Sequence, residues 1–467
     1  MVAFLLATAG LWVYWNIESR RRAAAMLAEY RAQGQPMSIE DFHLTPIPDA
    51  ENAALLLRQA AAAIVIPDDA PASLRELCDD PSGYPEFAAK LIEKNNGSLR
   101  LVREARGRSR FFWNVPVPRY LINVTLSDLG PQKDLARLLC ITAVVETKAG
   151  HCSAAAARLD DALFVAEGIG QVWPCVMTYL VREAVEELTI REIETLLPQW
   201  KTASENLSSE TSTHAPISAL LQRLLEEDSC LTSWDFALQG ERLVQIETGL
   251  VIVDDPPGTH GVLFSPALRL NVVQIAEQTD AAWQAGRLSN WPQARELLPT
   301  YPETASGYYT LTNLITQLIV VDLRGATARH FHASLQRRFA MTALALRLYE
   351  AEHGAPASSL EELVPAYLPT VPCDPFSLAN EPIRYLCTKE RDILYSVGPN
   401  GINEGGSPTL DRLSSSLSEP GDLVFYLRGK RTVSSRTINH ESTQRVDDDL
   451  NEQNRRGNAD QRAKEGK

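Results

Sequence analysis

Apolar residues recur every three or four positions along most of the chain, which is the pattern of amphipathic helices. The pattern is nearly continuous between residues 133 and 197, where Leu135, Leu138 and Leu139 share one face and Gly150 is placed to end a helix. Further helices are predicted at residues 49–63, 90–110, 171–197 and 216–250. We therefore expect a mainly α-helical protein.

Residues 149–163 are rich in small side chains and are similar to one tetratricopeptide-type helical hairpin, in which small residues let two helices pack closely. No second copy follows at a period of about 34 residues. We therefore expect residues 18–300 to form an irregular, partly solenoid-like α-helical region.

The pattern changes in the last third of the chain. A long helix is predicted at residues 327–353, with Met341, Leu344 and Leu348 on one face and Gly354 at its end. Short strand-like runs follow at residues 383–386, 393–396 and 422–427. This order predicts a small α+β domain at residues 303–430, with one long helix and a small antiparallel sheet.

The first residues of the chain are unlike the rest. Residues 2–14 carry no charge, Trp12, Tyr14 and Trp15 suit a membrane interface, and Arg20–Arg22 form a charged stop. Roughly sixteen apolar residues are fewer than the about 20 that usually span a bilayer. We expect residues 1–17 to be a membrane anchor helix, and a buried N-terminal helix is the alternative.

The orientation of such an anchor is open. The positive-inside rule would keep Arg20–Arg22, and with them the body, in the cytoplasm. No basic segment precedes the apolar run, and a start further upstream that supplied one would reverse this balance. We expect a single-pass protein of the bacterial inner membrane with an extracytoplasmic body.

Charge limits the range of partners. The chain has 45 Lys and Arg against 59 Asp and Glu, a net charge of −14, which argues against a nucleic-acid partner. The arginines at residues 100–110 are interpreted as a solvated helix face. Residues 431–467 have no aromatic side chain and are expected to form a disordered tail.

The sequence contains no linear catalytic motif. His330 and His332 lie two positions apart on a predicted helix, so they point to different faces and are poor joint metal ligands. The acidic pairs at residues 160–161, 186–187 and 361–362 are interpreted as solvated helix faces. Cys373 and Cys387 flank a predicted turn, and either a disulfide or two free thiols would suit them.

Residues 327–427 resemble the globular head of the major pseudopilins of type II secretion systems. The shared features are the long helix, the Asp374-Pro375 segment, the β-hairpin and the glycine-rich loop at residues 398–406. Roughly 300 residues precede this region, whereas a pseudopilin head follows its N-terminal helix directly, so filament assembly is not expected.

In that family the glycine-rich loop binds a structural calcium ion. The resemblance therefore implies calcium ligands at Asn400, Asn403, Glu404 and Asp422, and hard oxygen ligands of this kind suit calcium. Two positions that are acidic in the family are asparagines here, and a serine-rich insertion at residues 407–419 separates the loop from Asp422. The alternative is a loop stabilised by its own hydrogen bonds.

The combination of anchor, residues 48–54, helical middle and this head resembles a group of uncharacterised membrane-anchored bacterial proteins. That resemblance implies no known activity. We predict a membrane-anchored, non-catalytic binding or scaffold protein of the cell envelope, linked to secretion or surface assembly and with a protein partner. The alternative is a hydrolase-type enzyme whose site is assembled from non-contiguous residues.

Overall fold

The computed structural model describes residues 1–42, 44–68, 70, 73–200, 211–226, 228–254, 258–298, 322–388, 391–407 and 421–428, and gives the backbone alone at residues 211–214, 228–230 and 258–262. The predicted tail at residues 431–467 and most of the insertion at residues 407–419 lie outside the described residues.

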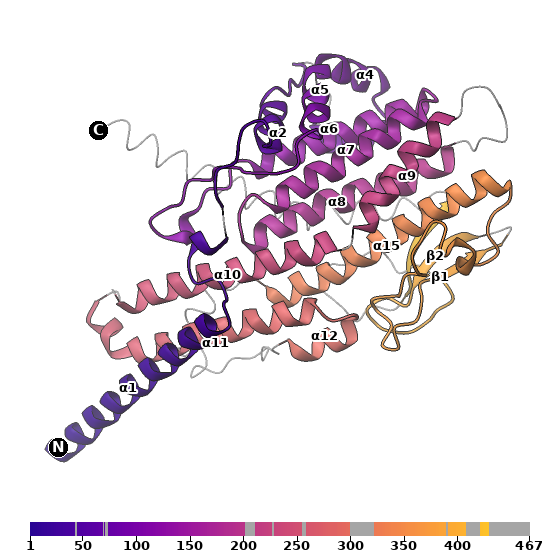
Figure 1. Ribbon diagram of the computed structural model, residues 1–467. Coiled ribbons are helices and arrows are strands. Elements are labelled where there is room, and N and C mark those ends of the chain that lie inside the picture. Colours follow the sequence, from indigo (N-terminus) through magenta and orange to yellow (C-terminus); the bar gives the residue numbers. More distant parts are fainter. Residues whose placement is uncertain are drawn as a thin grey trace.

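Helices make up most of the described chain (Figure 1). The first part contains α1 (Val2–Ala32), α2 (Ala53–Ala62), α3 (Leu74–Asp79), α4 (Pro85–Lys94), α5 (Asn96–Ala105), α6 (Leu129–Lys148), α7 (Cys152–Gly170) and α8 (Val176–Leu196). The second part contains α9 (Thr211–Leu225), α10 (Asp228–Asp254), α11 (Gly258–Gly286), α12 (Trp291–Leu297), α15 (Leu323–His353), β1 (Arg384–Cys387), β2 (Asp392–Ser396) and β3 (Leu423–Arg428). The prediction of a mainly α-helical chain with a small C-terminal antiparallel sheet is confirmed.

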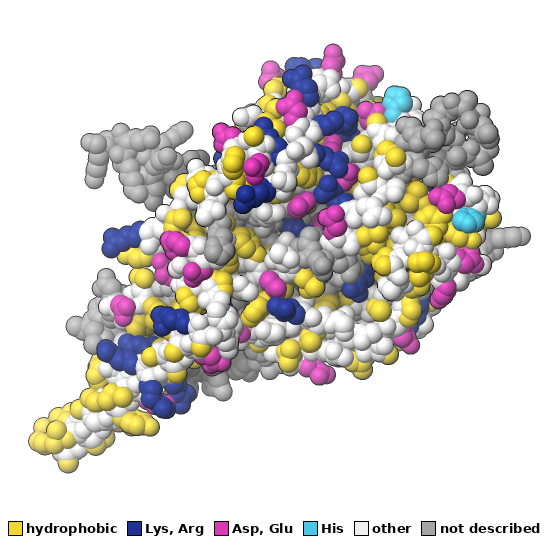
Figure 2. Space-filling model, viewed as in Figure 1, with side chains coloured by type: hydrophobic (Ala, Val, Ile, Leu, Met, Phe, Trp, Pro, Cys, Tyr) yellow, Lys and Arg dark blue, Asp and Glu magenta, His cyan; other side chains and the backbone are white. Residues whose placement is uncertain are grey.

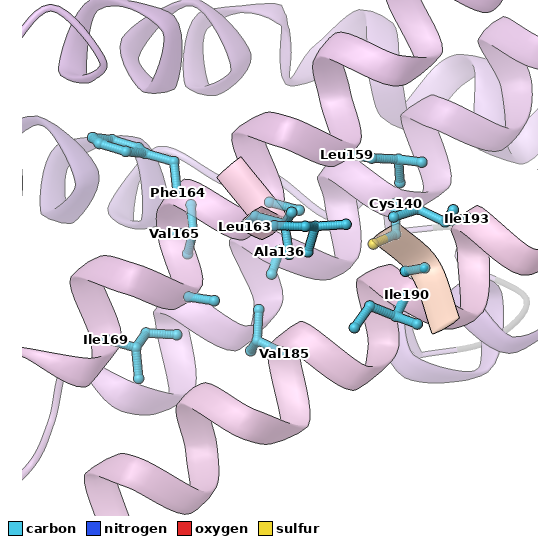
Figure 3. Packing of buried hydrophobic residues seen from close by; sticks show 14 of the residues in the cluster. Ala136, Cys140, Leu159, Leu163, Phe164, Val165, Ile169, Val185, Ile190 and Ile193 are labelled. Atoms are coloured by element: carbon cyan, nitrogen blue, oxygen red, sulfur yellow. The ribbon is translucent and has the colours of Figure 1, made fainter. Parts of the chain in front are cut away.

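The centre of the body is a stack of consecutive helices, α6, α7 and α8, with α9 against α7. Figure 3 shows how fully buried side chains from α6, α7 and α8, among them Ala136, Leu159 and Ile190, meet between the helices. The turn between α6 and α7 contains Gly150 at a φ of +83°, a left-handed conformation that glycine adopts without a steric cost. The predicted helix end at this glycine is therefore confirmed.

The N-terminal helix is one continuous element rather than a separate anchor and helix. In its second half, Ser19, Ala23, Met26 and Tyr30 are buried, and their spacing of four, three and four residues puts them on one face. This face packs on α11 in an apolar cluster separate from the main core, together with Ile246, Val253, Leu268, Val272, Ile275 and Ala276.

The first half of α1 extends away from the body, and its apolar side chains are exposed (Figure 2). Phe4 is 71% exposed and Leu6 is 69% exposed. The alternative of a buried N-terminal helix is therefore wrong for this half. Among the described residues, no helix has both the length and the apolar character needed to cross a bilayer.

The C-terminal part is built on the long helix α15. This helix ends at Gly354, whose φ of +72° is again left-handed. The strands form an antiparallel sheet in the order β1-β2-β3, close to the predicted strands. The sheet packs on α15, where the rings of Phe339 and Phe425 lie 5.9 Å apart.

Cys373 and Cys387 are both free and exposed. Cys373 lies opposite Pro382, whereas Cys387 lies opposite Asp392 in the β1–β2 pair. The two thiols are therefore not cross-strand neighbours, and of the two alternatives the structure has the free thiols.

A buried arginine on α15 connects this helix to the body. Arg337 donates from Nη1 to Glu186 Oε1 on α8 at 2.5 Å, and from Nε to the Leu224 carbonyl on α9 at 2.7 Å. Its Nη2 donates to the Arg223 carbonyl at 2.8 Å. Arg182 Nη2 lies 3.1 Å from the second oxygen of Glu186, so this buried carboxylate has two cationic partners.

The interpretation of the acidic pairs as solvated faces is wrong for the pair at residues 160–161 and for Glu186, whereas Glu187 is exposed. Glu186 is buried, and Asp160 and Asp161 are buried beside Arg106 of the predicted solvated arginine face, with Arg106 Nη1 at 3.1 Å from Asp161. Only the pair at residues 361–362 is fully exposed as expected. Burial makes these carboxylates structural, because an ion removed from water needs a partner at close range.

Replacing Arg337 should therefore destabilise the whole chain. In Arg337→Met, Glu186 keeps only Arg182 and the α9 carbonyls lose their donor, so we expect a loss of about 3 kcal/mol or more in the free energy of unfolding. Urea denaturation measures this loss. The control is Arg338→Met, which removes the exposed hydrogen bond to the Cys373 carbonyl and leaves Glu186 with both of its arginines, so it should cost about 1 kcal/mol or less. Equal losses in the two variants would contradict the role of Arg337.

Candidate functional site

The four predicted calcium ligands lie close together, in the loop between β2 and β3. Asn400 Nδ2 donates to Glu404 Oε1 at 3.0 Å, and the Glu404 backbone N–H donates to Asp422 Oδ1 at 3.3 Å. Asn403 Oδ1 accepts from the Gly405 N–H at 3.0 Å. Asp422 itself is buried at the start of β3.

Most side-chain oxygens of this loop already accept hydrogen bonds. Asp422 Oδ2 accepts from the Gly406 N–H at 2.6 Å, Glu404 Oε1 also accepts from the Gly421 N–H, and Asn400 Oδ1 accepts from the Ile402 N–H. The exception is Glu404 Oε2, which is buried and has no hydrogen-bond partner. Within the described residues, no three His, Cys, Asp or Glu side chains converge as a metal-binding group. A cation here would compete with N–H donors for every nominated oxygen but one.

A second buried carboxylate, Asp374, fixes the segment before the sheet. Its Oδ1 accepts from Ser396 Oγ at 2.7 Å and from the Phe376 N–H at 2.9 Å, and its Oδ2 accepts from the Val397 N–H at 3.0 Å. Burial raises the pKa of Asp374, and these hydrogen bonds oppose the shift. The Asp-Pro segment therefore holds the end of β2, where the glycine-rich loop begins.

A cavity of about 330 Å³ lies between the C-terminal half of α15, the sheet and a short 3₁₀ helix, η3 (Leu197–Gln199). Its apolar wall includes Leu197, Leu346 and Leu427. Its charged side chains are Arg347 and Glu350 from α15, Asp392 from β2 and Arg428 from β3. The lining comes from segments far apart in the sequence, so no linear motif could have indicated it.

The charges in this cavity alternate and pair with one another. Glu350 accepts from Arg347 Nη1 and from Arg428 Nη2, both at 2.7 Å, and Arg428 Nε lies 3.1 Å from Asp392 Oδ2. Two buried atoms have no hydrogen-bond partner, Arg347 Nε and Asp392 Oδ1. Burial raises the pKa of Asp392, and the Arg428 guanidinium opposes that shift.

This lining suits binding better than catalysis. An apolar wall with a few placed polar groups is the usual composition of a ligand pocket. General acid–base catalysis requires a group that can exchange a proton with a substrate, and the carboxylates here are held by arginines. The cavity could accept a side chain or small group that has both a hydrogen-bond donor and an acceptor.

A buried chain of titratable side chains runs through the helical body, away from this cavity. Tyr179 Oη lies 2.6 Å from His330 Nδ1, and His330 Nε2 lies 3.0 Å from the Gly286 carbonyl. A carbonyl only accepts, so Nε2 carries the hydrogen and Nδ1 accepts from the tyrosine. Burial lowers the pKa of His330 to about 4, which keeps the imidazole neutral.

Glu183 on α8 extends this chain, because its carboxyl group is hydrogen-bonded to Tyr179. Burial raises the pKa of Glu183 to about 8, and Arg182 opposes the shift. Arg182 also donates from Nη1 to Glu183 Oε1, so this buried carboxyl group has a cationic partner inside the core. All three side chains are buried, and none of them lines the cavity described above. The chain therefore links α8 to α15 and α11 as part of the core.

Comparisons with protein-family models, with curated proteins and with solved structures found no match to this chain. The functional interpretation therefore depends on the residues and the geometry described above.

Proposed function

We propose that this chain is a membrane-attached, non-catalytic binding or scaffold protein of the bacterial cell envelope. The observation that carries the proposal is the exposed apolar half of α1, residues 2–17, which contains no charged side chain. Large contiguous apolar patches on a protein surface usually mark a membrane or protein interaction site. Each such side chain gains about 1.5–3 kcal/mol when it is fully removed from water.

The binding part of the proposal is supported by the cavity beside the sheet. In Figure 1 the sheet lies at the end of the molecule opposite the start of α1. A membrane-attached chain would thus present this cavity away from the bilayer, where a side chain of a protein partner could enter it. The resemblance of residues 327–427 to pseudopilin heads supports a link to secretion or surface assembly. An extracytoplasmic body remains part of the proposal.

The alternative of a hydrolase-type enzyme receives its support from the same cavity, where ionisable groups from α15, β2 and β3 converge. Against it, Glu350 and Asp392 are both engaged by arginines. We therefore favour binding.

Membrane attachment is tested by flotation of the full chain with phospholipid vesicles in the absence of detergent. We expect the wild type to float with the vesicles and the double variant Leu5→Asp, Leu6→Asp to float at least about tenfold less, because a charge in an inserted helix is costly. The matched control is Val117→Asp, Ile122→Asp, which changes two exposed apolar residues of the body and should behave as the wild type. A wild-type chain that stays with the soluble fraction would contradict the proposal.

A structural calcium ion in the loop at residues 398–406 also remains a proposal, carried by the pseudopilin resemblance. The unpartnered Glu404 Oε2 supports it, whereas the hydrogen bonds to Asp422 weigh against it. A bound ion would stabilise the folded chain, by about 2.7 kcal/mol at a hundred times its dissociation constant.

The calcium proposal predicts that millimolar calcium raises the unfolding temperature of the full chain above its value in a chelator. The increase should disappear in Glu404→Gln and persist in Glu381→Gln, which changes an exposed carboxylate outside the loop. Differential scanning calorimetry measures both effects. An unfolding temperature that is the same with calcium and with chelator would remove the ion from the account and leave the hydrogen-bonded loop.

A further inference from the structure

A second exposed apolar site lies at the start of α11, next to α1. Leu263 is 56% exposed and Phe264 is 43% exposed, although the residues that follow, from Pro266 to Arg269, are buried. Exposing two adjacent large apolar side chains to water at the end of a helical hairpin is unfavourable in free energy. Their position relative to α1 indicates what covers them.

Helices α1 and α11 run side by side in the same direction. Three hydrogen bonds at nearly constant sequence offset establish this: Trp12 Nε1 to the Leu263 carbonyl at 2.9 Å, Arg269 Nη1 to Asn16 Oδ1 at 3.1 Å, and Tyr30 Oη to Asp280 Oδ2 at 2.5 Å. Leu263 is therefore level with Trp12 along the common axis. The ten residues from Val2 to Leu11 extend about 15 Å beyond that level, at 1.5 Å per residue.

Cationic side chains lie behind this level on both helices. Arg20, Arg21 and Arg22 follow on α1, and Arg269 on α11 also donates to Ser19 Oγ at 3.1 Å. Burial and the nearby Arg20 both lower the pKa of Arg269, which places the two cations close together. Glu18 pairs with Arg21 and Arg22, and Asp254 lies near Arg269. Among the described residues of this region, four cations therefore lie near two anions.

Three layers therefore follow one another along the axis. The first is the apolar start of α1, the second is Trp12 at the level of Leu263 and Phe264, and the third is the group of arginines. A bilayer leaflet presents its own layers in the same order, from hydrocarbon through the interface to the phosphates. A folded protein partner would not require this layering. The layering thus favours a lipid surface over a protein.

We propose that Leu263 and Phe264 form a second membrane contact, inserting into the interfacial layer beside Trp12 while the exposed Arg20, Arg21 and Arg22 contact anionic phospholipid headgroups. This inference depends on the proposed membrane attachment and goes beyond it, because two contacts on different helices fix how the body is oriented on the surface. A single inserted helix would leave the body free to rotate about the helix axis.

The test is binding of the full chain to vesicles of phosphatidylcholine and phosphatidylglycerol in equal parts, measured by sedimentation over a lipid titration. We expect the double variant Leu263→Asp, Phe264→Asp to lower the partition coefficient of the chain onto the vesicles by about tenfold. The Leu263 carbonyl that accepts from Trp12 belongs to the backbone and remains in this variant. Leu263→Ser, Phe264→Ser should weaken binding less, and both variants should keep the helical circular dichroism of the wild type.

The matched control is Leu378→Asp, an exposed apolar residue of the C-terminal part, which should bind as the wild type does. Vesicles of phosphatidylcholine alone should bind the wild type more weakly, because the arginines lose their anionic partners. If the wild type binds and Leu263→Asp, Phe264→Asp binds equally well, the second contact is wrong while membrane attachment stands. If the wild type does not bind either vesicle, both are wrong.

Discussion

The rest of this structure depends on one buried ion pair, between Arg337 on α15 and Glu186 on α8. Removing two charges from water is costly, and the cost is offset only where geometry and additional hydrogen bonds are favourable. Here Arg182 supports Glu186, and carbonyls at the end of α9 accept from Arg337, so one guanidinium joins three helices. Because α15 also carries the sheet, this pair fixes the C-terminal part to the helical body.

The body that this ion pair holds together has two different ends. Along α1 and α11, apolar, aromatic and cationic residues follow one another in the same order as the hydrocarbon, interface and phosphate layers of a bilayer leaflet. At the opposite end, α15 and the sheet enclose a cavity with alternating charges. A rigid body between them would hold the cavity at a fixed distance from the surface to which α1 attaches. This arrangement is what we expect of a binding or scaffold protein, since such a protein acts by holding a binding site at a fixed place relative to the membrane.

The features that could be predicted from sequence are those with a local signal. The apolar stripe of residues 327–353 and the glycine at 354 predicted α15, and the short strand-like run at residues 393–396 predicted β2. The burial of Asp160, Asp161 and Glu186 could not be predicted, because an acidic pair on a helix looks the same whether it faces water or an arginine from a distant helix. The contact of Trp12 with Leu263 and the residues that line the cavity could not be predicted either, because both bring together residues far apart in the chain. The predicted calcium ligands were brought together by the fold, but most of the hydrogen bonds that occupy their oxygens come from the backbone.

The most direct test of the central claim is hydrogen–deuterium exchange of the full chain with and without anionic vesicles. The account predicts slower exchange with vesicles in residues 2–17 and around residues 263–269, and unchanged exchange in β1, β2 and β3. Identical exchange in the first half of α1 under both conditions would contradict membrane attachment through this helix.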